Sequence, residues 1–300
     1  MSSAAAARQP SLFTIWWLAF RPKTLVAAVV PVAVGAAVAQ QHGGFALLPT
    51  LACLVGALLI QIGTNLANDA FDFEKGADTE ERLGPTRAVQ AGILTSRQVK
   101  LATAVVFAMA VGVGLYLSTV GGWPIVALGV VSIASGVAYT AGPYPLAYVG
   151  LGELFVMIFF GFAAVCGTAF IQLGLVPEGS IWCGAGVGAV STALIVVNNL
   201  RDRETDARSG KMTLIARFGR GFGLAEYAAS VAVAYLVPVV LIARELAPLT
   251  VMGVFLTLPL AVQATHGVWT REGRDLNASL GDTARLLVMY GVTLALGVAF

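Results

Sequence analysis

Long apolar runs dominate the chain, and two longer polar segments interrupt them near positions 67–97 and 198–223. The runs are unbroken and do not alternate between apolar and polar residues, which favours helices over the strands of a membrane barrel. Their lengths match the roughly 20 residues that a helix needs to cross a bilayer. We therefore predict nine membrane-spanning helices, at about 24–41, 46–66, 98–118, 121–140, 151–172, 179–200, 224–244, 249–267 and 282–300.

The composition agrees with a membrane protein. Of the 300 residues, 58% are hydrophobic and 11% are charged, whereas soluble domains carry about 25% charged residues. The mean hydropathy is +0.84. At about 20 residues per span plus connections, this length accommodates roughly eight to ten helices. We expect an all-α fold, a polytopic helical bundle, in which residues 1–300 form a single transmembrane domain.

The placement of the charges predicts the orientation of the bundle. If the N-terminus is cytoplasmic, every Lys and Arg except Arg244, of 18 in total, falls on the cytoplasmic side of the predicted helices. The positive-inside rule describes this asymmetry. Both long polar segments then face the cytoplasm, and long loops in compact proteins are usually functional.

Each long polar segment begins with a cluster of carboxylate and amide side chains, and the two clusters share one spacing. Residues at i, i+3 and i+7 lie on one face of an α-helix. The shared positions are Asn65, Asn68 and Asp72 in the first cluster and Asn199, Asp202 and Asp206 in the second. This repetition suggests an internal duplication.

Clustered carboxylates of this kind predict a cation site. Two carboxylates about 5 Å apart repel by roughly 3 kcal/mol at an effective dielectric of about 20. A shared cation converts this repulsion into attraction, and Mg²⁺ prefers carboxylate oxygens together with phosphate oxygens. A diphosphate is therefore a natural ligand, and five basic residues in the same segments could neutralise it. They are Lys75, Arg87, Arg201, Lys211 and Arg217.

The alternative interpretation is that both segments are solvated loops whose mixed charges form no site. It does not account for the same spacing occurring twice. We therefore expect the two clusters to face each other.

At these residues the chain resembles the UbiA superfamily of membrane prenyltransferases, whose two aspartate motifs read NxxxDxxxD and DxxxD. Asn68 and Asp72 match the first motif, and Asp202 and Asp206 match the second. The third position of the first motif departs, because five residues separate Asp72 from Asp78. This spacing is similar to that of the branch that prenylates 1,4-dihydroxy-2-naphthoate in menaquinone synthesis. Further similar segments lie at 17–24, 84–87, 139–148, 150–153, 210–214 and 276–284.

The resemblance implies nine helices around a central cavity, in a bacterial cytoplasmic membrane, with the active-site loops in the cytoplasm. It implies transfer of a polyprenyl group from polyprenyl diphosphate to 1,4-dihydroxy-2-naphthoate, with loss of the ring carboxylate. Mg²⁺ would assist ionisation of the allylic diphosphate by neutralising the leaving group. The partners would be these two substrates and the lipid bilayer. We expect no nucleic-acid partner, and the oligomeric state stays open.

The resemblance also implies roles for single residues. The metal ligands would be Asn68, Asp72, Asp78, Asp202 and Asp206. Additional ligands or supporting residues would be Asn65, Asp69, Asn198 and Asn199. Lys75, Arg87 and Lys211 would bind the diphosphate. The residues closest to the chemistry would be Asp72, Asp202, Asp206, Lys211 and Tyr139.

Several residues have two interpretations. Tyr139, Tyr144 or Tyr148 would stabilise an allylic cation through their π-faces or orient the ring hydroxyls, or they would be ordinary interfacial tyrosines. Arg21 would bind the diphosphate or the substrate carboxylate, or anchor the first helix on the positive side. Glu153 would complement the dipole of the helix that it begins, or contact substrate.

Three rival functions share some of these features. A different aromatic acceptor, hydroxybenzoate or homogentisate, would keep the superfamily. An ion-coupled transporter would also show polar helix residues and duplication, but carrier sites lie near the bilayer midplane, whereas these clusters lie at helix ends. A CDP-alcohol phosphotransferase would carry a DGxxAR element between its aspartates, and none follows Asp72.

Overall fold

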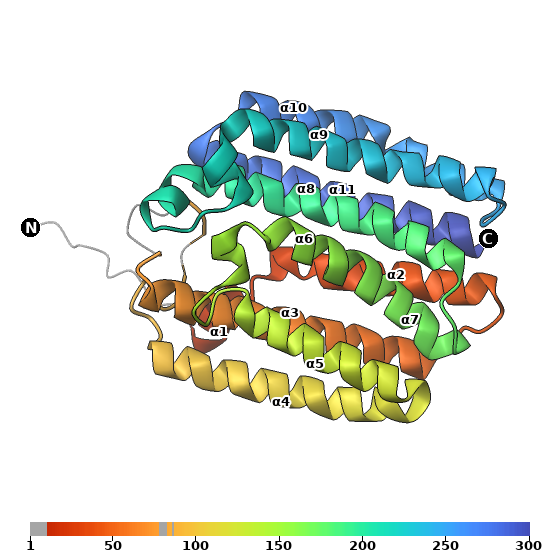
Figure 1. Ribbon diagram of the computed structural model, residues 1–300, viewed down its shortest axis with the longest axis horizontal. Helices are drawn as coiled ribbons and strands as arrows, with labels where there is room; N and C mark the ends of the chain where they lie inside the picture. The colour runs from red at the N-terminus through yellow and green to blue at the C-terminus, as the bar shows by residue number, and fades with distance from the viewer. Residues whose placement is uncertain (1–10, 78–82, 86) are drawn as a thin grey trace, which may run out of the picture.

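The computed structural model is a bundle of helices that run mainly along one common direction (Figure 1). It describes residues 11–77, 83–85 and 87–300, and every element in this part of the chain is helical. The α-helices are α1 (Leu12–Ala19), α2 (Val26–Gln41), α3 (Leu47–Glu74), α4 (Ser96–Gly121), α5 (Trp123–Ala138), α6 (Gly152–Val156), α7 (Ala164–Leu173), α8 (Glu178–Arg208), α9 (Leu214–Ala243), α10 (Leu258–Thr270) and α11 (Leu276–Ala299). Short 3-10 or π segments are η1 (Pro22–Thr24), η2 (Leu146–Val149), η3 (Met157–Ala163), η4 (Leu249–Thr257) and η5 (Gly273–Asp275).

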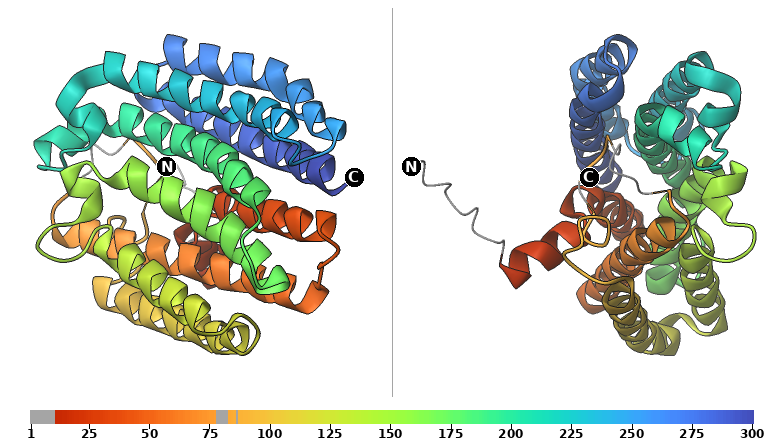
Figure 2. Two further views of the ribbon diagram at one scale, coloured as in Figure 1. Left: turned by 45° about the vertical axis from the view of Figure 1, so that its right-hand side comes forward. Right: turned by 90° about the vertical axis from the view of Figure 1, so that its left-hand side faces the viewer.

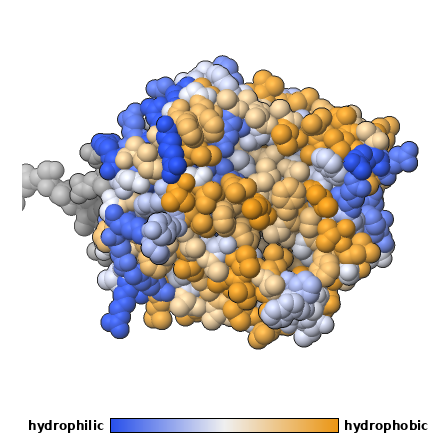
Figure 3. Space-filling view, in the orientation of Figure 1, coloured by the Kyte–Doolittle hydropathy of each residue, from blue (hydrophilic) through white to orange (hydrophobic). Residues whose placement is uncertain are grey.

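The helices have the length and composition of membrane spans. Among the described residues, 7 helical segments are long and apolar enough to cross a membrane. The helical pair Thr14–Thr24 and Val26–Gln41, bent by 52°, gives an eighth if it is counted as one span. The shorter apolar helix α5 occupies the remaining predicted span. Large hydrophobic side chains such as Leu101 and Leu115 are exposed on α4. The face of the molecule drawn in Figure 3 shows apolar surface between more polar regions at its two ends. Together with the membrane-length helices, this confirms the prediction of a multi-pass membrane bundle.

The two helices that carry the aspartate clusters continue further than predicted. α3 ends at Glu74 rather than near 66, and α8 ends at Arg208 rather than near 200. Polar side chains end the apolar run without ending the helix, since Asn and Asp disfavour a helix only weakly. Both clusters therefore lie on helix, and the loops that follow are shorter than expected.

A glycine ends both helices in the same way. Gly76 and Gly210 have positive φ angles of 71° and 76°, which glycine adopts without steric cost. The N–H of the next residue donates to the carbonyl oxygen of Asp72 (2.9 Å) in α3 and of Asp206 (2.8 Å) in α8. This bond is characteristic of a Schellman motif. Each cluster thus places its last aspartate four residues before the terminating glycine.

α8 lies in the core of the bundle, and 78% of the residues in its 18-residue apolar stretch are buried. Glycines allow its neighbours to approach closely. A Cβ on Gly184 would lie 3.1 Å from the carbonyl oxygen of Gly161, and one on Gly161 would lie 2.9 Å from the Cα of Gly188. Small residues at such crossings are typical of membrane helices. They position the cluster-bearing end of α8 against the segment that contains α6.

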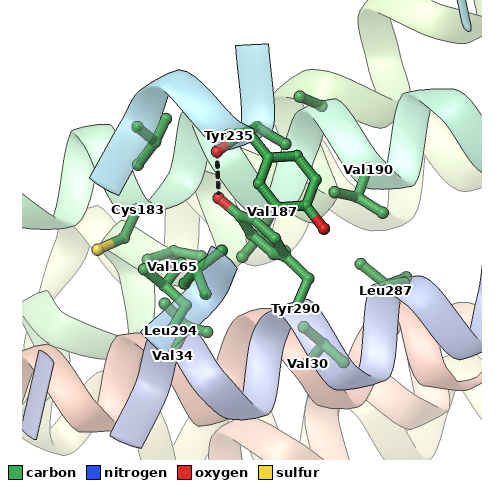
Figure 4. Packing of buried hydrophobic residues seen from close by; sticks show 14 of the residues in the cluster. Val30, Val34, Val165, Cys183, Val187, Val190, Tyr235, Leu287, Tyr290 and Leu294 are labelled. Carbon is green, nitrogen blue, oxygen red and sulfur yellow. Dashed lines mark hydrogen bonds between the residues drawn. The ribbon is translucent and has the colours of Figure 1, made fainter. Parts of the chain in front are cut away.

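A tyrosine satisfies a backbone carbonyl that a proline leaves without its helical donor in α9. Pro238 has no N–H, so the carbonyl of Ala234 four residues earlier lacks its helical donor. The buried Tyr290 of α11 donates its hydroxyl to this carbonyl at 2.8 Å. Figure 4 shows Tyr290 reaching from α11 into a cluster that includes Val187. The pairing matters because an unsatisfied carbonyl inside a membrane bundle is costly.

One end of the bundle carries both clusters. The C-terminal ends of α3, α5 and α8 and the N-terminal ends of α4, α6 and α9 gather at the left of Figure 1. The end-on view in Figure 2 shows these helix ends arranged around the axis of the bundle. The connections at the opposite end are short, as between α4 and α5. The fold therefore brings together the longer polar segments of both halves of the chain.

Candidate active site

Asp72 lies in the last turns of α3 and is 2% exposed. Its Oδ2 atom accepts a hydrogen bond from Nη1 of Arg87 at 2.8 Å, and its Oδ1 atom accepts one from the Tyr148 hydroxyl at 3.0 Å. Arg87 is also buried and donates to the backbone carbonyl of Asn68 at 2.8 Å. A buried carboxylate needs a cation and hydrogen-bond donors. Asp72 has both, from two different loops.

The neighbouring residues on α3 hold the surrounding loops. The side-chain oxygen of Asn68 accepts a hydrogen bond from the hydroxyl of Thr140 at 2.9 Å, which connects α3 to the segment after α5. Asp69 accepts a hydrogen bond from the backbone N–H of Ala88 at 3.2 Å. This second contact fixes the loop next to Arg87, so Asp69 supports the site without facing it.

Asn65 shapes the N-terminal bend. Its side-chain amide donates to the carbonyl of Phe20 and to the hydroxyl of Thr24, both at 3.0 Å. Between them, Arg21 has a φ of 53°, a left-handed conformation that is uncommon outside glycine. The Arg21 side chain lines the cavity described below. Asn65 thus acts on the site through the backbone that carries Arg21.

Asp206 occupies the equivalent end of α8 and pairs with Lys211, whose Nζ lies 3.5 Å from Oδ1. The other carboxylate oxygen, Oδ2, is buried and has no hydrogen-bond partner among the described residues. A buried unsatisfied polar atom requires a physical explanation. An oxygen in this position is available to a cation.

Asp202 is held by its neighbour in sequence. Arg201 donates from Nε to Oδ1 at 2.8 Å and from Nη2 to Oδ2 at 2.6 Å. Both side chains are buried. The remaining donors of Arg201 bind the side-chain oxygens of Asn198 at 2.8 Å and Asn277 at 2.9 Å. Asp202 therefore belongs to a hydrogen-bonded network one turn from Asp206.

Asn199 connects the second cluster to α6. Its side-chain amide donates to Oε1 of Glu153 at 2.7 Å, and both residues are buried. Glu153 lies in the first turn of α6, where the helix dipole favours a negative charge. It also lines the cavity. Its position agrees with the dipole interpretation made from the sequence, and contact with substrate stays a prediction.

Tyr148 lies between two lysines. The Nζ atoms of Lys75 and Lys211 lie 4.9 and 6.0 Å from the centre of its ring, within the range of cation–π attraction. Lys75 also donates to the carbonyl of Gly142 at 3.2 Å. Burial lowers the pKa of Lys75, while the Asp72 carboxylate acts in the opposite direction. Tyr148 thus joins the loops that follow both clusters.

The other two tyrosines differ sharply in position. Tyr139, just beyond the end of α5, lines the cavity. Burial and three nearby carboxylates raise the pKa of its phenol, so it keeps its proton and can donate a hydrogen bond. Tyr144 is 81% exposed and does not belong to the cavity lining.

A cavity of about 60 Å³ joins the groups from both clusters. The predicted site residues that line it are Arg21, Asn68, Asp72, Arg87, Tyr139, Asn198, Asn199 and Lys211. Asn65, Asp69, Lys75, Asp202 and Asp206 lie outside this lining, and Asp78 falls outside the described residues. Residues of both clusters therefore line one cavity, Asn68 and Asp72 from the first and Asn198 and Asn199 from the second, and the joint site of all the aspartates stays a prediction.

Some lining residues had no assigned role in the sequence analysis. They are Thr140, Ala147, Gly152, Ile195 and Thr213. Three of them fall within or next to the segments 139–148 and 150–153 that carry the family resemblance, which was the only signal available for them. Asn277, which binds Arg201 and lies outside the cavity lining, also had no role assigned from the sequence.

The donor set suits a hard divalent cation. In the described parts of the chain, no three Asp, Glu, His or Cys side chains converge as a metal centre, and basic residues pair with the aspartates instead. The oxygens of Asp72, Asp206 and Asn68 are nevertheless the type that Mg²⁺ prefers. The buried Oδ2 of Asp206 also has no competing hydrogen-bond donor among the described residues. The residues present therefore fit Mg²⁺.

The sequence profile of the UbiA prenyltransferase family matches residues 28–289. The chain therefore belongs to the UbiA prenyltransferase family. It is 35% identical over 294 residues to a 1,4-dihydroxy-2-naphthoate octaprenyltransferase of Bacillus subtilis, covering 97% of this chain and 94% of the relative. It is also 35% identical over 289 residues to the enzyme of the same description from Mycobacterium tuberculosis, covering 96% and 98%.

Solved structures show the same fold at lower sequence identity. A UbiA homolog from Aeropyrum pernix K1 superposes with a TM-score of 0.72 at 18% identity, covering 92% of this chain and 98% of that protein. A UbiA homolog from Archaeoglobus fulgidus, solved bound to DMAPP and Mg²⁺, gives a TM-score of 0.63 at 15% identity, covering 93% and 99%. The resemblance inferred from the motifs is confirmed across nearly the whole chain.

Proposed function

We propose that the chain transfers a polyprenyl group from polyprenyl diphosphate to 1,4-dihydroxy-2-naphthoate, giving demethylmenaquinol, CO₂ and diphosphate. The observation that carries the proposal is one cavity lined by Asp72 of the first cluster and Asn199 of the second, together with the basic side chains of Arg87 and Lys211. The naphthoate acceptor is supported by the octaprenyltransferases that match over nearly their full length. The rival transporter function has no such support.

The diphosphate binds against the basic residues of the cavity. Three basic side chains line this cavity: Arg21 from the N-terminal bend, Arg87 from the loop after α3, and Lys211 from the loop after α8. Arginine matches phosphate oxygens with paired N–H groups, whereas lysine supplies a mobile point charge. Their positive charge stabilises the negative charge that develops on the diphosphate as the allylic C–O bond breaks.

Mg²⁺ is the cofactor of the proposed reaction. Asp72 and Asp206, with the side-chain oxygen of Asn68, are the residues that would hold it. Arg201 binds both carboxylate oxygens of Asp202, so the role of Asp202 as a ligand stays a prediction. When bound, the ion supplies Lewis-acid neutralisation of the leaving diphosphate. The role of Asp78 as a further ligand stays a prediction, because it lies outside the described residues.

The bond changes balance without a further reactant. The allylic C–O bond breaks, and its electron pair leaves with the diphosphate. The electron-rich ring carbon that bears the carboxylate forms the new C–C bond, and the C–CO₂ bond then breaks and returns its electron pair to the ring. Tyr139, which keeps its proton and lines the cavity, donates a hydrogen bond to a ring oxygen, and stabilisation of the allylic cation by Tyr148 stays a prediction. The burial of the site keeps water from the allylic cation.

The proposed location is a bacterial cytoplasmic membrane. The chain would act as a single transmembrane domain, with its N-terminus and cavity on the cytoplasmic side. The charge asymmetry supports this orientation, and the cavity is lined by residues from the C-terminal ends of α3 and α8 and from the loops that follow them. The soluble naphthoate would reach the site from the cytoplasm, whereas the polyprenyl chain would stay in the lipid.

An acceptor panel tests the proposal. Purified protein in liposomes is supplied with Mg²⁺, a polyprenyl diphosphate and one of three acids: 1,4-dihydroxy-2-naphthoate, hydroxybenzoate or homogentisate. The expected result is a prenylated naphthoquinol and stoichiometric CO₂ from the first acid only. Product from another acid alone would contradict the naphthoate acceptor and show that the chain prenylates a different aromatic acid.

A further inference from the structure

Asn277 lies in the first turn of α11 and connects two segments that are far apart in the sequence. Its side-chain oxygen accepts a hydrogen bond from Nη1 of Arg201 at 2.9 Å. Its side-chain nitrogen donates to the carbonyl of Leu83 at 2.9 Å, and also to that of Arg274 at 2.9 Å. One amide thus joins α8 to the loop after the first cluster.

Gly84 also lies close against the Arg201 guanidinium. A Cβ at Gly84 would lie 2.8 Å from Nη2 of Arg201 and 3.0 Å from its Cζ. Such distances are closer than side-chain carbons normally approach, so only glycine leaves room for the arginine in this position. Leu83 therefore contacts Asn277, and the next residue, Gly84, contacts Arg201.

These contacts complete a connection between the two clusters. Arg201 holds both carboxylate oxygens of Asp202 in the second cluster. Leu83 and Gly84 precede Arg87 by four and three residues in the sequence, and Arg87 holds Asp72 in the first cluster. All of these side chains except Asn277 belong to one of the clusters or to its loop. Asn277 comes from the last helix and is used by both.

We propose that Asn277 is a positioning residue for diphosphate binding: it fixes the Arg201 guanidinium between Asp202 and the backbone at Leu83–Gly84. The proposal rests on the prenyl-transfer function given above. It gives a role in the site to α11, a helix that carries neither aspartate motif. Its consequence is that Asp202 and Arg87 reach their positions together rather than independently.

The two functions of the amide can be separated by substitution. Asn277→Asp keeps an oxygen acceptor for Arg201 but loses the N–H that binds the carbonyl of Leu83, whereas Asn277→Ala loses both contacts. Hydrogen bonds to charged groups are worth enough to change an affinity by about tenfold or more. We expect both variants to bind the diphosphate about tenfold more weakly, with the alanine variant the more impaired.

The measurement is the affinity for farnesyl thiolodiphosphate, an unreactive analogue, in detergent-solubilised full-length protein with Mg²⁺. The KM values for the polyprenyl diphosphate and the naphthoate are measured in parallel. The expected pattern is a raised analogue Kd and a raised diphosphate KM, with the naphthoate KM unchanged. Equal changes in both KM values would indicate a general structural defect and would overturn the proposal.

Glycine substitutions give a matched comparison. Gly84→Ala introduces a methyl group against Arg201 and should raise the analogue Kd as Asn277→Ala does. Gly281→Ala, one turn further along α11, has open space at its Cβ position and should bind like the wild type. If Gly84→Ala and Asn277→Ala also bind like the wild type, Asn277 does not position the site.

A double variant tests whether Asn277 acts through Arg201. In an Arg201→Gln background, Asn277→Ala should have no further effect on the analogue Kd, because residues that share one interaction are not additive. An undiminished effect would contradict the proposal. If the wild type itself neither binds the analogue nor transfers a prenyl group, the proposed function fails, and this outcome is distinct from normal binding by the Asn277 variants.

Discussion

Asp72 and Asp206 occupy equivalent helix positions but have different partners. Asp72 is bound by Arg87 at 2.8 Å and by the Tyr148 hydroxyl at 3.0 Å. Asp206 has only a lysine, at 3.5 Å, and a buried oxygen without a donor in the described structure. Arg87 holds Asp72 in a fixed geometry, whereas Lys211 is a flexible point charge. We therefore infer that Asp206 is the carboxylate more readily available to a cation.

The first prediction concerns these two carboxylates. Asp72→Asn and Asp206→Asn each remove a negative charge and keep the shape of the side chain, so each should lower kcat about 100-fold or more, the scale expected for loss of an electrostatic group. The measurement is prenyl transfer in liposomes with Mg²⁺. Thermal denaturation of each variant serves as the control for folding. Full turnover by a correctly folded Asp206→Asn variant would contradict the two-cluster site.

The second prediction concerns Tyr148. Tyr148→Phe removes the hydroxyl that binds Asp72 but keeps the ring between Lys75 and Lys211, so the loss in kcat should be modest, about tenfold or less. Tyr148→Ala removes the ring as well and should be several times worse. Tyr144→Phe, at an exposed position of the same loop, is the matched control and should leave turnover unchanged. A Phe variant as inactive as the Ala variant would show that the ring has no role.

At the scale of elements, α3 and α8 repeat one structural unit. In each, the side chains at i, i+3 and i+7 precede a glycine at i+11 that ends the helix in a Schellman motif. The glycines are Gly76 and Gly210, and the equivalent bonds end on the carbonyls of Asp72 and Asp206. The shared helix end extends the evidence for duplication beyond the side-chain spacing.

The third prediction tests this shared helix end. Gly76→Ala and Gly210→Ala place a Cβ on residues with positive φ, and each should lower the free energy of unfolding by about 1 kcal/mol. Thermal denaturation in detergent measures the effect. Gly221→Ala, where neither φ nor space opposes a methyl group, is the control. Equal stability of all three variants would mean that the left-handed conformation is not required.

The sequence predicted the elements better than their ends and their partners. The apolar runs located the helices, and the repeated spacing located the clusters, because both depend on local periodicity. The hydrophobic pattern placed the ends of α3 and α8 too early, because the apolar residues stop before the helices do. The helices continue to the terminating glycines at 76 and 210. The spacing alone put Asn65 and Asn68 in one set, and the family motif was needed to separate them; of the two, only Asn68 lines the cavity. Such differences depend on which loop packs against each turn.

At the scale of the whole molecule, the long-range pairing was the part least accessible to sequence. The pairs Arg87–Asp72 and Asn277–Arg201 join residues from separate loops and helices. Their formation depends on how α3, α8 and α11 pack, which no local pattern encodes. The family resemblance identified the right segments, including 276–284, but not which atoms meet within them.

The fourth prediction concerns the orientation of the bundle. Arg97 and Thr119 are exposed at opposite ends of α4, so a cysteine at each position reports on one side of the membrane. In a background with the three native cysteines replaced by alanine, a membrane-impermeant thiol reagent added to intact cells should label Thr119→Cys and not Arg97→Cys. Permeabilised cells should give labelling of both. The reverse pattern in intact cells would place the cavity outside the cytoplasm.

The measurement that tests the central claim most directly is the cation dependence of prenyl transfer by the purified wild-type protein. Turnover of polyprenyl diphosphate and 1,4-dihydroxy-2-naphthoate is followed with Mg²⁺, after addition of EDTA, and after restoration of excess Mg²⁺. A site built from two sets of oxygen donors predicts formation of the prenylated naphthoquinol, its loss in EDTA and its recovery with Mg²⁺. Product formation that continues undiminished in EDTA would contradict the account.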